Sequence, residues 1–345
     1  MKSAITFPYK KVTKDLLSVL NPRAKEVLTG RFGLGIDPSR KTLESIGRKY
    51  GITRERVRQI ENFAIKAIKK SDKYKLAISN FEEIKSLMMK QGGIVHEEEF
   101  LLSISKDKGV QNHVHFYMVL HDDFKSTKEN EHFNKHWSVE PKVTEVVHSA
   151  LMNLHSTISD EEMVAESILL DRFLKQMEEL HEVYKSKEML NKYLSLSKIL
   201  GKNQMGEWGK RTSPNIKTRG VKDYAYLVVR KANKPMHFRE VSRAILEEFK
   251  KKAHVATCHN ELIRDPRFVL VGRGIYGLRE WGHSGGIVRD VIMEVMNKAD
   301  KPLTKNEIIE LVKNERVVKE NTVLVNLQNP KFFDKTEDGK FSVKK

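Results

Sequence analysis

Six consecutive residues, Arg54-Glu-Arg-Val-Arg-Gln59, have the side chains with the clearest chemical potential in this chain. Arg, Gln and Glu are the side chains that form hydrogen bonds with base edges in the major groove of DNA. The apolar residues Val57, Ile60 and Ala64 are spaced as on one face of a helix, so their neighbours face outward. The pattern predicts four base-reading side chains at the N-terminus of a helix: Arg54, Glu55, Arg58 and Gln59.

Lysines follow on the same predicted helix and suit DNA phosphates rather than bases. The candidates are Lys66, Lys69 and Lys70. A surface helix that is merely solvated by its charges would explain these lysines well. It would explain the clustered arginines before them poorly, so we favour a nucleic-acid interface.

Two short helices must hold these side chains in place. Thr42 and Thr53 are suited to be N-cap residues, each with a glutamate in the turn that follows. The two amphipathic segments meet at Gly51, as expected of a helix-turn-helix.

Four stretches in this part of the chain resemble, in order and spacing, region four of housekeeping-type bacterial sigma factors. They are Leu20-Asn-Pro-Arg-Ala-Lys-Glu-Val-Leu28, Arg31-Phe-Gly-Leu34, Thr42-Leu-Glu-Ser-Ile-Gly47 and Thr53-Arg-Glu-Arg-Val-Arg-Gln-Ile-Glu61. The resemblance covers about residues 18–70. It implies that the segment reads promoter DNA around the −35 element and docks on the flap of the β subunit of RNA polymerase.

Carried over by position, the resemblance assigns base reading to the four side chains named above and places Arg23 and Thr42 near the DNA backbone. The β flap would contact the face around Leu28, Phe32 and Leu34. Phe63 departs from the family, which usually has a lysine there, so one DNA contact is lost.

The C-terminal third contains an internal repeat. Asn233-Lys-Pro-Met matches Asp300-Lys-Pro-Leu at an offset of 67 residues, and Asp265-Pro-Arg-Phe268 matches Asn329-Pro-Lys-Phe332. Each copy is predicted to form three helices and a β-hairpin, which is a winged helix.

The first copy is similar to the HARE-type helix-turn-helix domain, through Met236-His-Phe-Arg-Glu240 and Asp265-Pro-Arg-Phe-Val-Leu-Val-Gly-Arg-Gly274. That family also occurs in the delta subunit of bacterial RNA polymerase and fused to chromatin factors and restriction enzymes. The alternative is that this module docks on protein through its third helix. The DNA-binding candidates are Thr257, His259, Asn260 and Arg264 on that helix and Arg273 at the wing tip.

The predicted fold is mainly α-helical with small β wings, a multidomain array of helix-turn-helix and winged-helix modules. The acidic middle favours a spacer or a protein-binding surface. The expected domains are 1–75 (sigma-like), 76–140 (degenerate winged helix), 141–215 (helical, with a linker from Gly206 to Gly220), 216–283 (HARE-type) and 284–345 (second repeat).

Charge is unevenly distributed along the chain of 345 residues, whose net charge is +17. Residues 1–75 hold 19 basic and 7 acidic residues, 76–215 hold 17 and 22, and 216–345 hold 27 and 17. Two basic ends therefore flank an acidic middle, and basic clusters are the electrostatic footprint of phosphate binding. Net charge that only aids solubility is the alternative.

Other chemistry is not indicated. The single Cys258 excludes an internal disulfide and a Cys-rich zinc site. Its neighbour His259 has no orienting acid nearby for nucleophilic catalysis. His113, His115 and His121 lack a fixed metal-ligand spacing. No segment reaches the ~20 apolar residues of a membrane span, and we expect no secretory signal. We expect a cytoplasmic protein with no enzymatic activity, cofactor, metal or small-molecule substrate.

Double-stranded promoter-like DNA and core RNA polymerase are the expected partners, and a sigma-like transcription factor is the expected function. Two alternatives remain open: a delta-like polymerase accessory subunit that acts by protein contacts, and the DNA-binding component of a defence or restriction system. In sigma factors a helical domain N-terminal to region four melts the promoter. The residues before Ser18 are too few for it, so we expect no transcription initiation by this chain alone.

Overall fold

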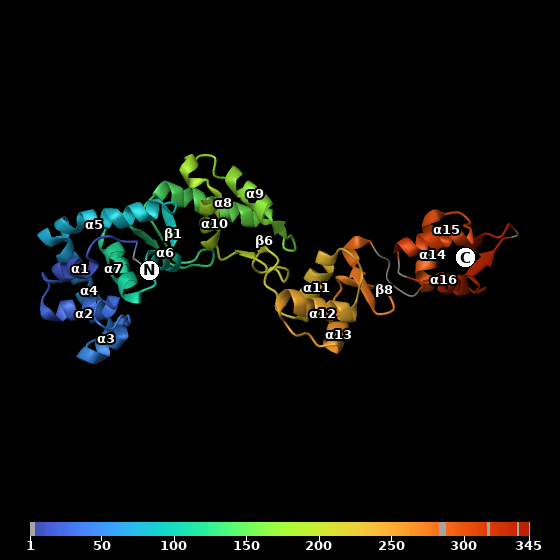
Figure 1. Ribbon diagram of the computed structural model, residues 1–345, viewed down its shortest axis with the longest axis horizontal. Coiled ribbons are helices and arrows are strands. Elements are labelled where there is room, and N and C mark those ends of the chain that lie inside the picture. Colours follow the sequence, from blue (N-terminus) through green and yellow to red (C-terminus); the bar gives the residue numbers. More distant parts are fainter. Residues whose placement is uncertain (1–3, 283–287, 316–317, 337, 345) are drawn as a thin grey trace. The chain divides into compact units, whose positions relative to one another are not determined.

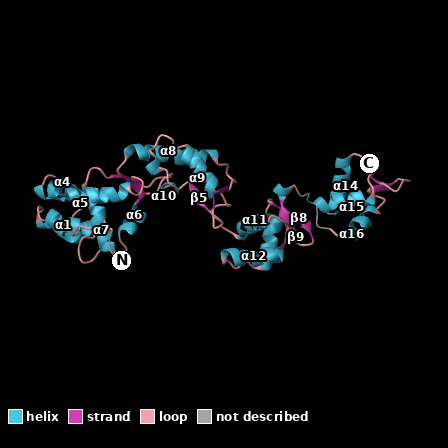
Figure 2. Cartoon of the chain, turned by 45° about the horizontal axis from the view of Figure 1, so that its top comes forward, coloured by secondary structure: helices cyan, strands magenta, loops and turns pink. Residues whose placement is uncertain are grey.

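The computed structural model describes residues 4–282, 288–315, 318–336 and 338–344 (Figure 1). These residues form two compact parts: one reaches Lys202 and includes Gly206–Arg211, and the other consists of Asn203–Met205 and the residues from Thr212 onward. Helices predominate and the sheets are small and antiparallel (Figure 2), which confirms the predicted fold class. No helix among the described residues combines the length and apolar character needed to cross a bilayer.

Four helices precede the first strand: α1 (Tyr9–Leu17), α2 (Pro22–Phe32), α3 (Leu43–Tyr50) and α4 (Arg54–Lys69). The side chain of Asn21 caps α2 by accepting a hydrogen bond from the Ala24 amide at 2.8 Å, and Pro22 fits the first helical turn. Gly33 ends α2 with a φ of 63°, a left-handed conformation that favours glycine.

The described residues from Asp72 onward form four units, each with three α-helices and a β-hairpin, and in the first three units a short strand follows the first helix. In the first winged unit (residues 72–138), the first strand pairs with the third, which pairs with the second. Its elements are α5 (Asp72–Met89), β1 (Ile94–His96), α6 (Glu97–Ile104), α7 (Lys108–Leu120), β2 (Lys125–Thr127) and β3 (His136–Ser138).

The second winged unit (residues 141–210) has the same strand order, β4-β6-β5. Its elements are α8 (Pro141–Thr157), β4 (Val164–Ala165), α9 (Glu166–Lys175), the 3₁₀ turn η1 (Glu182–Tyr184), α10 (Lys187–Ser195), β5 (Leu200–Lys202) and β6 (Glu207–Lys210). This corrects the prediction of a purely helical domain and linker at 141–215, because β6 lies inside the expected linker and forms a wing with β5.

The third winged unit (residues 221–278) again has the order first, third, second. It contains α11 (Val221–Ala232), β7 (Met236–His237), α12 (Phe238–Phe249), α13 (Val255–Arg264), β8 (Phe268–Gly272) and β9 (Ile275–Leu278), and the 3₁₀ turn η2 (Arg279–Trp281) follows.

In the fourth winged unit (residues 288–343), an isolated bridge from Leu303 to Phe341 takes the place of the first strand. Its elements are α14 (Val288–Ala299), α15 (Lys305–Glu315), α16 (Glu320–Leu327), β10 (Phe333–Lys335) and β11 (Phe341–Val343).

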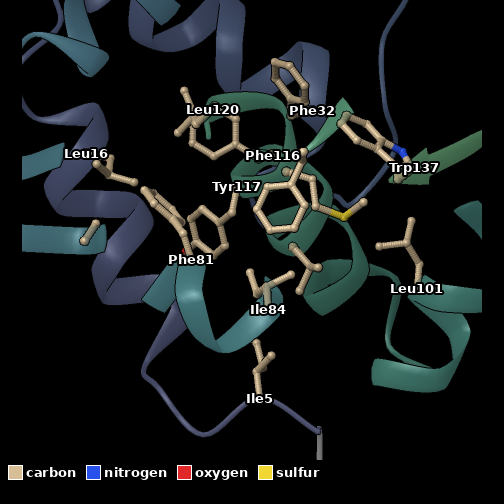
Figure 3. Packing of buried hydrophobic residues seen from close by; sticks show 14 of the residues in the cluster. Ile5, Leu16, Phe32, Phe81, Ile84, Leu101, Phe116, Tyr117, Leu120 and Trp137 are labelled. Atoms are coloured by element: carbon tan, nitrogen blue, oxygen red, sulfur yellow. The ribbon is translucent and has the colours of Figure 1, made fainter. Parts of the chain in front are cut away.

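One hydrophobic core joins the four N-terminal helices to the first winged unit. Figure 3 shows Leu16 from α1, Phe32 from α2, Phe81 from α5 and Phe116 from α7 in this core. The predicted boundary between residues 75 and 76 therefore does not separate two cores, because α5 and α7 complete the packing of α1 and α2.

A second core fills the second winged unit and also includes Ile94 and Phe133 of the first. Tyr193 on α10 is completely buried and donates a hydrogen bond to the carbonyl of Gly92 at 2.9 Å. The second winged unit is thus packed against the first through its own third helix.

Candidate nucleic-acid interface

Local backbone features fix the angle between α3 and α4. Thr42 and Thr53 each accept a hydrogen bond from the backbone amide three residues later, at 3.1 and 3.2 Å, so both predicted N-caps are present. A Cβ atom on Gly47 would lie 2.6 Å from the carbonyl oxygen of Ile52, so only glycine allows this close approach. Gly51 turns the chain with a φ of 64°.

The buried face of α4 sets the direction of its polar side chains. Val57, Ala64 and Ile68 are completely buried, and this turns the opposite face of the helix outward. The four predicted base-reading side chains, Arg54, Glu55, Arg58 and Gln59, are all exposed.

These side chains are partly paired with one another in the free chain. Arg58 donates two hydrogen bonds to Glu55, at 2.8 and 2.9 Å, and Arg56 donates one to Gln59 at 2.9 Å. The hydrogen bond from Arg58 lowers the pKa of the Glu55 carboxyl. Exposed pairs of this kind contribute little to stability, so these groups can exchange their partners for base edges.

The predicted phosphate contacts fall into two groups. Arg23, Thr42, Lys66 and Lys70 are exposed, and the guanidinium of Arg23 lies 5.5 Å from the centre of the Tyr50 ring. Lys69 instead forms a 2.5 Å ion pair with Asp122 of the first winged unit. Lys69 is therefore less available to a phosphate than its neighbours.

Phe63 is 64% exposed, which is unusual for so large an apolar side chain. It lines a hollow of about 810 Å³ between the start of α2 and the middle of α4. Arg23, Arg56 and Gln59 line the same hollow. An apolar surface thus adjoins the predicted DNA-reading side chains.

The predicted polymerase-binding face is not a free surface in this structure. Leu28 is completely buried and Phe32 is 5% exposed in the core that α2 shares with α7, and Leu34 is partly buried against the same core. The ring centres of Phe32 and Phe116 lie 5.1 Å apart. These residues are thus not accessible in this structure, and the contact with the β flap stays a prediction.

The third helix of the third winged unit presents a polar face. Thr257, Asn260 and Arg264 are exposed on α13, where their spacing of three and four residues places them on one side. His259, which is also predicted to contact DNA, is only partly exposed. Its ring stacks on that of Phe238, with the ring centres 4.3 Å apart.

Cys258, on the opposite side of α13, is completely buried, and burial raises the pKa of its thiol to about 11. A protonated, buried thiol is a poor nucleophile. Cys258 is thus a packing residue of the third winged unit.

The wing of the third unit places Arg273 at its exposed tip. Gly274 follows with a φ of 71°, and a Cβ atom there would lie 2.8 Å from His237 and 2.9 Å from Phe238. The wing is therefore packed closely on the start of α12, which limits where Arg273 can point.

Three lysines that sequence reasoning missed, Lys250, Lys251 and Lys252, connect α12 to α13. All three are exposed, and Lys250 ends α12 in a left-handed conformation with a φ of 55°. Because they immediately precede the exposed face of α13, they add positive charge at its N-terminal end. The run of three lysines was the available signal.

Among the described residues, one group of side chains has the spacing of a metal site: Glu82, His121 and Asp123. The carboxylate of Asp123 is already hydrogen-bonded to Lys85. His113 and His115, which the sequence grouped with His121, are instead buried in the core.

Comparison with known families agrees with this geometry. Residues 16–70, which include the α3–α4 pair, match the family "Sigma-70, region 4". Residues 219–281, which include the third winged unit, match the HARE-HTH family, whose description includes "restriction endonuclease HTH domain".

Curated relatives match the N-terminal segment. RNA polymerase sigma factor RpoD of Helicobacter pylori is 46% identical over 71 residues, or 21% of this chain and 10% of the sigma factor. Sigma factor SigA of Listeria monocytogenes is 45% identical over 60 residues, or 17% and 16%. This chain thus spans only about a tenth to a sixth of these relatives. It joins, in one polypeptide, a segment that matches the sigma-70 region 4 family and a segment that matches the HARE-HTH family.

Proposed function

We propose that this chain is a DNA-binding transcription factor that reads promoter-like duplex DNA through α4 and works with RNA polymerase. The observation that carries the proposal is the exposed face of α4, on which Arg58 and Gln59 stand beside Arg54 and Glu55. The likeness to sigma factors covers this same helix. Support also comes from a general rule: in helix-turn-helix proteins the N-terminal residues of the second helix contact base edges.

The third winged unit supplies a second DNA contact. The same unit also exposes Lys251 and Lys252, which precede α13 in the chain, and Arg273 on the wing. Flexible lysines and a wing arginine suit phosphates, so this contact adds affinity without fixing the sequence. No catalytic step is part of the proposal.

A second candidate function is that of a polymerase accessory subunit acting through protein contacts. The observation that favours it is that α7 and α10, the third helices of the first two winged units, are packed on protein. In other winged helices the third helix reads DNA, but in these two units it is already packed on protein. The third helix of the third unit, α13, could bind protein in the same way.

Selection of duplexes from a random pool by the full chain tests the first candidate. We expect one preferred sequence, and Arg58→Ala should bind it about 10–100 times more weakly while discriminating less against variants at one base pair. Lys106→Ala is the matched control, since it removes an exposed cation between α6 and α7.

Equal losses for the two variants on every duplex would contradict base reading by Arg58. The salt dependence of DNA binding separates the two candidates, because each neutralised phosphate adds about 0.9 to the slope of log K against log salt. A slope near zero would favour the accessory subunit.

A further inference from the structure

The helix α7 is buried in a way that a DNA-reading helix is not. Ten of its thirteen residues are buried, and Val114, Phe116 and Tyr117 are completely so. It packs against α1, α2 and α5, and Figure 3 shows its aromatic side chains between those of Phe32 and Phe81. The third helix of the first winged unit therefore packs on the helices before α5 instead of facing solvent.

A polar contact fixes one side of α7 to the loop after α2. The amide nitrogen of Asn112 donates hydrogen bonds to the carbonyls of Gly33 and Pro38, at 3.0 and 2.6 Å. Its carbonyl oxygen accepts one from Arg40 at 2.7 Å. Asn112 is only 3% exposed, so the loop after α2 provides its hydrogen-bond partners in place of water.

A second polar contact fixes α7 to α1. The hydroxyl of Thr13 lies 2.7 Å from Nδ1 of His113 and 2.6 Å from the hydroxyl of Tyr117, which donates to the carbonyl of Tyr9 at 2.6 Å. All three contacts are satisfied when His113 Nδ1 donates to Thr13 and Thr13 donates to Tyr117. The contacts on both sides specify one seating of the helix.

We propose that α7 occupies, within the chain, the apolar face of α2 that the polymerase β flap would need, so that the flap and α7 compete for it. The inference rests on polymerase being a partner, as proposed above. It follows from the burial of Leu28 and Phe32 in the core that α2 shares with α7, from the contact of Phe32 with Phe116, and from the two polar contacts that hold α7 there.

Competition affects the polymerase-binding face of α2 but not the DNA-reading face of α4. The face of α4 that carries Arg58 and Gln59 is exposed while α7 is seated, so DNA binding needs no rearrangement. Flap binding needs α7 to leave, and its apparent affinity is reduced by the small fraction of chains in which α7 is displaced. The closed chain would therefore hold promoter DNA without being tethered to polymerase through α2.

Binding of the full chain to bacterial core RNA polymerase tests the inference. Asn112→Ala removes the contact with the loop after α2 and should raise the affinity for core polymerase at least tenfold over that of the unaltered chain. Asn215→Ala is the matched control, because Asn215 is also 3% exposed and bonds Arg267 in the other compact part. It should leave the affinity unchanged.

Equal affinities of the unaltered chain and Asn112→Ala would overturn the inference. Hydrogen exchange of the unaltered chain gives a second test should Asn112→Ala fail to fold. Saturating core polymerase should speed the exchange of the α7 amides while α2 stays protected, because the bound flap takes the place of α7. Full protection of the α7 amides in the polymerase-bound chain would show that polymerase binds without displacing α7 and would also overturn the inference.

DNA binding is measured with the same preparations. A chain that does not bind duplex DNA contradicts the proposed function, whereas the polymerase comparison reports on α7 alone. The two failures are therefore distinguishable.

Discussion

The helices α7 and α13 hold the same position in two winged units with the same strand order, yet their surroundings differ. α7 is buried almost along its whole length, whereas only Cys258 and Leu262 are buried on α13. The buried residues of α7 include Phe116 and Tyr117, which pack in an apolar core. The exposed residues of α13 include Asn260 and Arg264, which suit a polar or anionic partner.

The comparison teaches that the third helix of this unit can be buried or exposed, depending on the residues that it carries. The strand order and the hairpin are common to both units and fix only where that helix lies. The aromatic residues of α7 pack on protein, whereas the polar and cationic residues of α13 leave that helix exposed.

The largest expected effect is on stability. Phe116→Ala should lower the free energy of unfolding of residues 5–139 by about 3–5 kcal/mol, because it leaves a cavity in the shared core. Asn260→Ala on α13 should change stability by less than about 0.5 kcal/mol, as at exposed sites generally. Hydrogen exchange of the α2 and α5 amides measures the first effect, and comparable costs for both variants would break the comparison.

A second prediction concerns the charge before α13. The double variant Lys251→Ala, Lys252→Ala should reduce the slope of log K against log salt by up to about 2 and keep the preferred DNA sequence. Fluorescence anisotropy at several salt concentrations measures the slope. An unchanged slope would mean that α13, like α7, faces protein.

A third prediction uses the contact between α7 and α1. Burial lowers the pKa of His113 to about 4, below the ordinary value of 6.5 that the unfolded chain would have. The unfolded chain therefore binds more protons between these values, and stability should decline as the pH falls from 6.5 toward 4. His113→Asn should flatten part of this decline in urea unfolding; an unaltered pH profile would contradict the role of His113.

The smallest effect is expected at Lys69. Its ion pair with Asp122 is partly exposed, so Lys69→Ala should cost less than about 1 kcal/mol in stability. It should weaken DNA binding less than Lys70→Ala, since Lys70 is exposed and Lys69 is only partly so. A larger loss for Lys69→Ala would show that DNA displaces Asp122.

Features that depend on neighbouring residues could be predicted from the sequence. The caps at Thr42 and Thr53 and the wing turn at Gly274 follow from side-chain chemistry and backbone conformation within a few residues. The third winged unit could also be predicted, because its copy 67 residues later reinforces the pattern.

Features that depend on residues distant in the sequence could not be predicted. Phe32 is hidden by Phe116, 84 positions away, and no local pattern indicates such a contact. The stacking of His259 on Phe238 has the same cause. The wing of the second unit was missed because β5 and β6 are three and four residues long, too short for a periodic pattern.

The helix α5 has a consequence for how such a chain can be recombined. The match to sigma-70 region 4 ends at residue 70, next to Ser71, the N-cap of α5. Yet Phe81 and Ile84 of α5 belong to the core that holds α1 and α2 together. A gene fusion or proteolytic cut at that border would expose this core on both fragments. The segment that matches the family is thus shorter than the smallest piece of this chain that keeps its hydrophobic core complete.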